Sequence, residues 1–292
     1  EGLPLLLAMA SDGGSNGGPA NGSSVTTLVR WLRTRSQTEK AALLGAAALL
    51  TLIVLWYFVE DHDNLFIIAE TVHFIGIGVL VYKLTQEKSC SGLSLKSQIL
   101  TAIFLAIRLM CSFVMEYDVH TVLDLLTLVA TGFVIYVIMN GSSGLRATYM
   151  KEQDSMSVAM VLVPCTVVAI IAHPSTNHAL PFRILWATCV YVEAVSVLPQ
   201  LHMFRGQKTV ERFTAHYVFA LGVARFFSCA HWFLQMFDGD SFLLSALGSG
   251  LWPIMVLLSE IVQTFILADF CYYYVKGQVT GGGVVRLPVD VV

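Results

Sequence analysis

Long apolar runs alternate with short polar segments along most of this 292-residue chain. The runs are roughly 17–25 residues long, which is the length that a helix needs to cross the hydrocarbon core of a bilayer. A run of this kind is expected to be helical, because a helix satisfies its own backbone polar groups inside lipid. We predict eight spans, at about 41–59, 65–84, 98–115, 121–139, 156–173, 181–200, 214–236 and 247–275.

Basic residues mark one side of these predicted spans. Of the 17 Lys and Arg residues, 14 lie in alternate segments, and the acidic loops between those segments contain none. Because loops rich in Lys and Arg stay in the cytosol, we predict cytosolic chain ends and lumenal acidic loops. The Asn-x-Ser sequons at Asn21 and Asn140 would then face the cytosol and remain unmodified.

The composition supports a membrane protein. Hydrophobic residues make up 56% of the chain and charged residues 13%, whereas soluble domains carry about 25% charged residues. We therefore predict an all-α polytopic membrane protein. The net charge of −3 is too small to indicate a nucleic acid partner. The six scattered cysteines include no CxxC pair, so we predict neither a disulfide framework nor a metal site.

The chain divides by composition into four regions. Residues 1–40 are Gly- and Ser-rich and then basic, and we expect a disordered cytosolic segment whose natural start is Met9. Residues 41–59 form an additional transmembrane helix, and residues 60–276 form a seven-span domain. Residues 277–292 form a cytosolic tail.

Glu193 lies near the middle of the sixth span, shortly before Pro199 and Gln200. A carboxylate at that depth costs a few kcal/mol unless it is paired or neutral, so Glu193 is a candidate functional residue. One interpretation is a structural ion pair with Arg225, which lies deep in the seventh span. The other is a water-filled cavity, open to the lumen and lined by spans two, three, six and seven.

Other polar residues inside the spans leave similar alternatives. Arg108 in the third span has no obvious partner and is available for an anionic ligand. His73 in the second span is either a packing residue or a proton sensor. Trp232 in the seventh span is either a packing residue or an aromatic wall for a ligand. Asp124 and Glu260 indicate no more than helix–helix hydrogen bonds.

Several strings of residues point to one family. Together they resemble the endoplasmic-reticulum lumen protein retaining receptors, which bind the Lys/His-Asp-Glu-Leu tails of escaped lumenal proteins and return them from the Golgi. Pro199-Gln200 also resembles the wider PQ-loop and SWEET-like architecture of two three-helix bundles joined by a linker helix. The matching strings are SCSGLSLKSQ at 89–98, RATY at 146–149, ILWATCVYVEAVSVLPQL at 184–201, AHYVFALG at 215–222 and VQTFILADFCYYY at 262–274.

The resemblance implies roles for individual residues. Arg108 matches the arginine that engages the C-terminal carboxylate of the ligand, and Trp232 matches a tryptophan that contacts the ligand. His73 matches the histidine whose protonation in the acidic Golgi favours binding. Glu193 and Arg225 match the buried polar pair beneath the cavity.

The resemblance also implies how the protein travels. Asp269 matches an acid in the last span that is linked to return transport. The implied partners are the C-terminal tails of lumenal proteins, membrane lipid and the vesicle coat machinery on the cytosolic side. The implied location is the endoplasmic reticulum and Golgi membrane.

This chain also departs from the family pattern, and most departures remove polar groups that would contact a ligand. Each lost charge-assisted contact is worth roughly 1.5–3 kcal/mol. We expect the loss of two arginines and one aspartate together to lower the affinity for the tetrapeptide about a thousandfold or more. We therefore predict the receptor fold with weak or altered binding of the standard tetrapeptide, offset in part by a new cation, Arg183, at the entrance. The departures are Phe66 and Ile67 for one arginine, Gln235 for a second, Cys111 for an aspartate, Ala224 and Ser228 for two tyrosines, Arg183 for a glutamate, and a tail with fewer lysines.

Three classes of function remain open from the sequence. The first is a retrieval receptor, or a divergent relative of one. The second is a PQ-loop small-molecule transporter that hinges at prolines such as Pro164, Pro199 and Pro253. The third is a scaffold that binds no ligand. The sequence contains no nucleophile–base pair and no phosphate-binding loop, so we predict neither an enzyme nor a bound cofactor.

Overall fold

The computed structural model describes residues 46, 50, 63–115, 119–140, 143–205, 207, 209–237, 250–279 and 285. The chain separates into two compact units, and the first, Glu1–Leu43, lies outside the described residues. The additional span predicted at 41–59 also lies outside them, apart from two single positions. All of the long helices that the structure describes belong to the second unit, Leu44–Val292.

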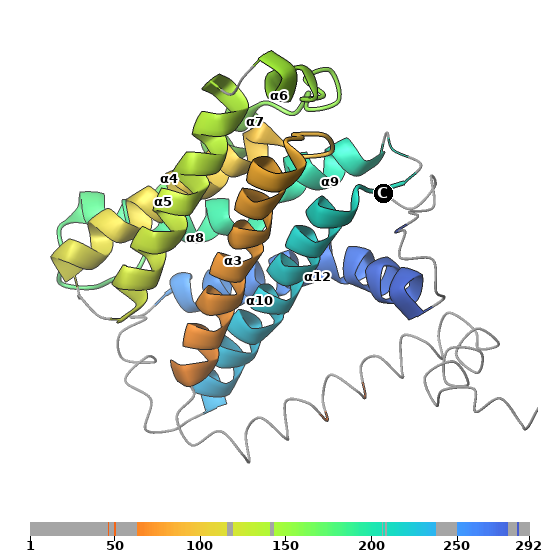
Figure 1. The fold of residues 1–292 in the computed structure, drawn as a ribbon. Helices are drawn as coiled ribbons and strands as arrows, with labels where there is room; N and C mark the ends of the chain where they lie inside the picture. The colour runs from red at the N-terminus through yellow and green to blue at the C-terminus, as the bar shows by residue number, and fades with distance from the viewer. Residues whose placement is uncertain are drawn as a thin grey trace, which may run out of the picture. The chain divides into compact units, whose positions relative to one another are not determined.

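The regular elements of the described residues are helices (Figure 1). Six helical segments among them are long and apolar enough to cross a membrane. The prediction of an all-α polytopic membrane protein is therefore confirmed. The elements are α3 Asp63–Tyr82, η1 Lys83–Glu87, α4 Leu95–Met115, α5 Val119–Asn140, α6 Ser143–Ala147, α7 Val158–Ile171, α8 Leu180–Val195, α9 Leu198–Arg205, α10 Arg212–Phe237 and α12 Trp252–Val279.

Two predicted spans differ from the helices that form. The span predicted at 156–173 is the 14-residue helix α7, which ends when Ala172 turns to an extended conformation just before His173-Pro174. A residue that precedes proline is disfavoured in helical conformation, which explains this end. The span predicted at 181–200 is two helices, because α8 ends at Val195 and α9 begins at Leu198. Proline suits the first turn of a helix, and Pro199 lies there in α9.

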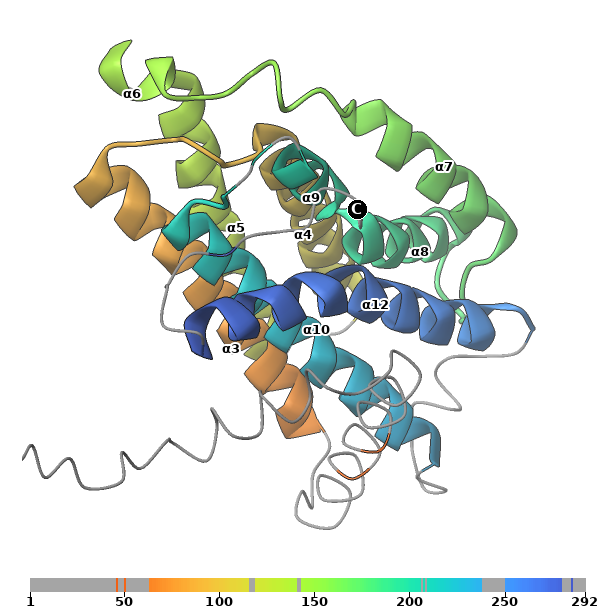
Figure 2. The same ribbon diagram turned by 90° about the vertical axis from the view of Figure 1, so that its right-hand side faces the viewer.

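The helices pack closely through small residues. α3 and α10 lie side by side over most of their length (Figure 1), and a Cβ atom added at Gly76 of α3 would lie 3.1 Å from the Cβ of Ala220. α12 crosses α10 on its other side, while α7 lies beside α8 (Figure 2). A Cβ atom added at Gly222 of α10 would lie 2.2 Å from the Sγ of Cys271 on α12. Small residues at both contacts let the helix backbones approach closely, as is usual in membrane bundles.

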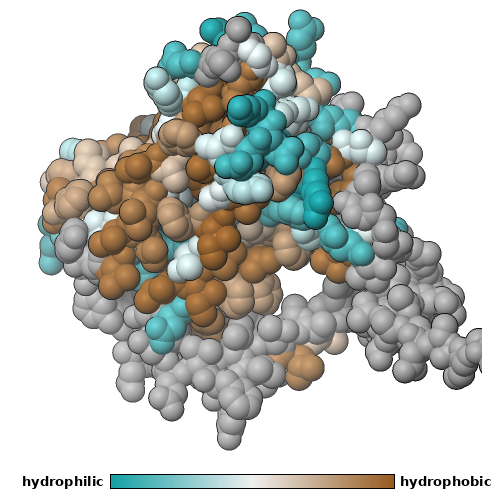
Figure 3. Space-filling view, viewed as in Figure 1, coloured by the Kyte–Doolittle hydropathy of each residue, from teal (hydrophilic) through white to brown (hydrophobic). Residues whose placement is uncertain are grey.

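The largest apolar core lies between α3, α10 and α12. It includes Ile77 and Leu80 from α3, Tyr217 and Val218 from α10, and Leu267 from α12. The outer surface over α4 and α5 is also apolar, whereas hydrophilic side chains gather at the end where α6, η1 and α9 lie (Figure 3). Apolar outer faces are the arrangement expected of helices that contact lipid.

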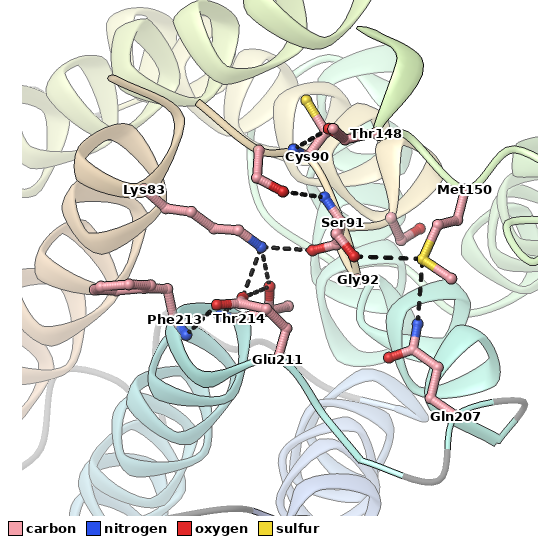
Figure 4. Close-up of polar contacts among 12 residues, drawn as sticks. Lys83, Cys90, Ser91, Gly92, Thr148, Met150, Gln207, Glu211, Phe213 and Thr214 are labelled. Atoms are coloured by element: carbon pink, nitrogen blue, oxygen red, sulfur yellow. Dashed lines mark hydrogen bonds and ion pairs between the residues drawn. The ribbon is translucent and has the colours of Figure 1, made fainter. Parts of the chain in front are cut away.

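A buried lysine organises the end of the bundle near α9 (Figure 4). The Lys83 side chain is 1% exposed. Its Nζ donates hydrogen bonds to the Ser91 carbonyl at 2.5 Å, to Glu211 Oε2 at 2.6 Å and to Thr214 Oγ1 at 2.8 Å. Burial raises the pKa of Glu211, but the hydrogen bond and the charge of Lys83 outweigh it, so this pKa lies below its ordinary value.

The same end contains a second set of hydrogen bonds around Gln200. Its Nε2 donates to the Gly92 carbonyl at 2.7 Å, and its Oε1 accepts from the Ser94 amide at 2.8 Å. Ser94 in turn donates from Oγ to Asp154 Oδ1 at 2.7 Å, and Tyr149 donates to Asp154 Oδ2 at 2.7 Å. Burial and this last hydrogen bond raise the pKa of the Tyr149 hydroxyl. We call the residues around Lys83 and Gln200 the α9-end layer.

The Lys83–Glu211 contact yields a stability prediction. Glu211→Gln leaves a buried ammonium with neutral acceptors alone, so we expect the free energy of unfolding to fall by about 3 kcal/mol near neutral pH. The lowered pKa of Glu211 means that its stabilisation is present at neutral pH and is lost as the pH falls through that pKa. The difference between native and variant chains should therefore shrink on acidification.

Thermal unfolding in detergent, measured from neutral to acidic pH, checks this prediction. The matched control is Glu152→Gln, since Glu152 is exposed. Equal losses of stability for Glu152→Gln and Glu211→Gln would show that the Lys83 contact contributes little.

Candidate functional site

Arg108 lies at the centre of a buried charge network. Its Nε donates to Asp124 Oδ2 at 2.7 Å, its Nη2 donates to Asp124 Oδ1 at 2.5 Å, and its Nη1 donates to Glu193 Oε2 at 2.9 Å. Glu70 Oε1 also lies 3.7 Å from the same Nη2 atom. Each nitrogen of the guanidinium therefore faces a carboxylate. The expectation that Arg108 lacks a partner is wrong, because α5 turns Asp124 toward α4.

Glu193 joins two arginines. Its Oε2 accepts from Arg108, and its Oε1 accepts from Arg225 Nη1. The ring of Phe104 lies beneath both cations, with its centroid 5.6 Å from Arg108 Cζ and 6.0 Å from Arg225 Cζ. The Glu193–Arg225 ion pair, which was one of the two interpretations of the sequence, is thus present. The same carboxylate also pairs with Arg108. One carboxylate between two cations connects α4, α8 and α10.

A small cavity lies beside this network. Its lining includes His73 of α3, Glu193 of α8, Arg225 of α10 and Gln263 of α12. Its volume is about 10 Å³, which is close to the least space that holds one water molecule. The Oε1 of Gln263 has no hydrogen-bond partner within the described part of the chain. This cavity is far smaller than a peptide, and α12 forms part of its wall, so it differs from the cavity lined by spans two, three, six and seven that the sequence suggested.

His73 and Arg108 both turn toward Glu193. His73 lines the cavity with Glu193, and its ring stacks on Phe104 with the centroids 6.4 Å apart. Arg108 contacts Glu193 directly. All three residues therefore lie next to one another inside the bundle.

A second polar contact lies one helix turn from His73 on α3. Glu70 Oε2 lies 2.8 Å from Nδ1 of His120 on α5. The ring of Phe66 lies against His120 at 4.8 Å and against His231 at 5.3 Å between centroids. The sequence analysis missed Glu70 and His120. Glu70 precedes His73 by three residues and so shares its helix face, which is a signal that could have identified it.

The network contains more carboxyl groups than guanidinium groups. Four carboxylates surround two guanidiniums, and Glu260 accepts a hydrogen bond from Ser228 Oγ at 3.0 Å without reaching either arginine by a hydrogen bond. The six groups are Glu70, Asp124, Glu193, Glu260, Arg108 and Arg225.

Two candidate residues lie apart from this network. Arg183, in the first turn of α8, donates from Nε to the Pro174 carbonyl and lies 3.2 Å from His173 Nδ1 through its Nη2. It therefore holds the loop between α7 and α8. Trp232 packs against an apolar cluster that includes Trp252 of α12. That packing agrees with the interior interpretation of Trp232.

The remaining candidates belong to the other end of the bundle or to its surface. Gln200 is fully buried in the α9-end layer, and Pro199 lies beside it in the first turn of α9. Asp269 is exposed on α12. Cys111, which replaces an aspartate of the family pattern, is buried with its Sγ 3.9 Å from the Phe182 carbonyl. The side chain of Gln235 lies outside the described residues.

The shared carboxylate yields a second stability prediction. Glu193→Gln removes the charge that two arginines share, so we expect a loss of about 3 kcal/mol in unfolding free energy. Glu260→Gln is the matched control, because Glu260 is also buried but makes its hydrogen bond with a serine. Thermal unfolding of the two variants in the same detergent makes the comparison. If Glu260→Gln lowers the unfolding free energy as much as Glu193→Gln does, the carboxylate shared by two arginines has no special contribution to stability.

Known proteins resemble this chain over most of its described length. Residues 89–235 match the family model of the ER lumen protein retaining receptor. ER lumen protein-retaining receptor erd-2.2 of Caenorhabditis elegans is 33% identical over 77% of this chain and 100% of its own length. The ER lumen protein-retaining receptor of Entamoeba histolytica is 32% identical, over 75% of this chain and 96% of its own.

A vertebrate relative gives the same result. ER lumen protein-retaining receptor 3 of Danio rerio is 33% identical over 76% of this chain and 96% of its own length. The matched region contains α4 to α10, and so it includes Arg108, Glu193 and Arg225. The chain belongs to the ER lumen protein retaining receptor family.

Proposed function

We propose that this chain is a retrieval receptor of the endoplasmic reticulum and Golgi membranes, which binds the C-terminal retention signals of lumenal proteins. The observation that carries this proposal is the match to relatives with that name over 96% or more of their length. The six apolar helical segments support a multi-pass location in those membranes. The vesicle coat machinery is the proposed partner on the cytosolic side.

The charge network supports Arg108, Glu193 and Arg225 as the ligand-recognition centre. A retention signal such as Lys-Asp-Glu-Leu ends in a carboxylate, and guanidiniums bind carboxylates with paired hydrogen bonds. Trp232 and Arg183 are proposed to contact the ligand farther out. His73, beside Glu193 in the cavity lining, is the proposed pH sensor because it matches the family histidine whose protonation favours binding.

Binding of the standard tetrapeptide is proposed to be weak. All three nitrogens of the Arg108 guanidinium already donate hydrogen bonds to carboxylates of this chain. Phe66 packs on His120 and His231 in the first turns of α3, where the family pattern has an arginine. A tetrapeptide must therefore displace existing contacts without all of the polar partners that the family pattern supplies.

The orientation is proposed from the distribution of basic residues. The α9-end layer, next to the basic segments, would face the cytosol, and the Arg108 network would lie toward the lumen. Asp269 on α12 and the tail after α12 would then be accessible to the transport machinery. Val285 of that tail pairs with Val210, just before α10, as an antiparallel bridge.

Peptide capture tests the receptor proposal. Purified chain should retain lumenal proteins with Lys-Asp-Glu-Leu tails more strongly at about pH 5.5 than at about pH 7.2, with dissociation constants above a micromolar. His73→Ala should remove most of the pH difference. Absence of capture at either pH would contradict the receptor proposal, whereas sub-micromolar binding would contradict the proposed weakness.

Glycosylation tests the orientation. Asn140 ends α5 on the side of the α9-end layer and forms an Asn-x-Ser sequon with the residues that follow. We expect no glycan on Asn140 or Asn21 when the chain is made in cells, because cytosolic sequons are not modified. Removal of N-glycans followed by gel electrophoresis makes the measurement. A mobility shift that Asn140→Gln or Asn21→Gln abolishes would reverse the orientation.

A further inference from the structure

Asp124 occupies Arg108 in the way that a ligand would. The two side chains are 3% and 8% exposed. Both carboxylate oxygens of Asp124 accept hydrogen bonds, one from Nε and one from Nη2 of Arg108. This side-by-side arrangement uses one complete edge of the guanidinium, and such an edge is where a guanidinium binds a carboxylate with paired hydrogen bonds.

The rest of Arg108 offers no other open place for an anion. Its third nitrogen, Nη1, donates to Glu193 at 2.9 Å. Its Nη2 also has Glu70 Oε1 at 3.7 Å. A further carboxylate would have to displace one of these three carboxylates from Arg108. The need for that displacement disfavours an anionic ligand group at Arg108.

We propose that Asp124 determines the ligand specificity of this site by occupying Arg108 and competing there with the terminal carboxylate of a tail. This inference rests on the proposed receptor function and goes beyond it by naming the residue that sets the preference. The native chain then has little preference for a free C-terminal carboxylate over a neutral terminal amide. Removal of the Asp124 charge opens the guanidinium edge to that carboxylate.

The network tolerates this change. Asp124→Asn leaves Arg108 with the hydrogen bond to Glu193 and with Glu70 nearby. The two guanidiniums remain balanced by three carboxylates, so no buried cation is left without a counter-charge. The asparagine amide also keeps an oxygen that can accept from Arg108.

The test measures binding of one synthetic peptide in two forms. The peptide ends in Lys-Asp-Glu-Leu, either with a free carboxylate or with a terminal amide, and the full-length chain is used in detergent. Asp124→Asn should bind the free-acid peptide at least about tenfold more tightly than the native chain does, with little change for the amide. Glu70→Gln is the matched control, because it removes one charge from the same network without freeing the Arg108 edge.

Each other result overturns the inference. If the native chain already binds the free-acid peptide about tenfold more tightly than the amide, a peptide carboxylate displaces Asp124 from Arg108 easily. A folded Asp124→Asn variant without a gain would assign Asp124 a purely structural role. An equal gain in Glu70→Gln would attribute the effect to net charge. Asp124→Ser is the second variant, and failure of both Asp124 variants to fold would likewise make the residue structural.

The outcome is separable from the receptor proposal. If the native chain captures tailed lumenal proteins but Asp124→Asn shows no gain, only the inference about Asp124 fails. If Asp124→Asn gains free-acid binding while the native chain captures no lumenal protein, the inference holds and the proposed function of the native chain fails.

Discussion

The Glu193 carboxylate, shared between Arg108 and Arg225, is the interaction on which the rest of the structure depends. A charge moved from water to a low-dielectric interior costs several kcal/mol even after relaxation, and a paired charge recovers that cost only with good geometry. In an apolar bundle, the need to keep these charges paired fixes the rotation of each helix about its own axis and its position along the bundle. α4, α8 and α10 each supply one member of the three, and α5 adds Asp124.

The α9-end layer imposes a similar constraint at the other end of the bundle. Lys83 connects η1 to the start of α10, and Gln200 connects α9 to the segment before α4. Apolar helix faces gain little from contacting one another instead of lipid, so polar contacts and close packing carry much of the specificity in membrane bundles. The apolar core around Ile77 and Tyr217 fills the space between these two polar centres.

The sequence predicts the spans because bilayer thickness fixes their length. It suggests the Glu193–Arg225 pair as one of two interpretations, because each residue is costly alone in an apolar run. It does not predict the Arg108–Asp124 pair, since 16 residues and a helix reversal separate them and periodicity does not give the rotation of α5 against α4. The break between α8 and α9 was marked by Pro199, but the apolar run continued through it. The size of the cavity depends on side-chain packing, which a span pattern does not contain.

Family membership and local geometry therefore describe different parts of this protein. The family match covers the residues Arg108, Glu193 and Arg225, whereas the role proposed for Asp124 rests on its hydrogen bonds to Arg108 in this structure. An experimental density map of the native chain with an excess of a Lys-Asp-Glu-Leu peptide tests this claim most directly. We predict that both Asp124 oxygens remain on Arg108 with no peptide carboxylate beside them. Density for the peptide carboxylate on Arg108, with Asp124 turned away, would contradict the account.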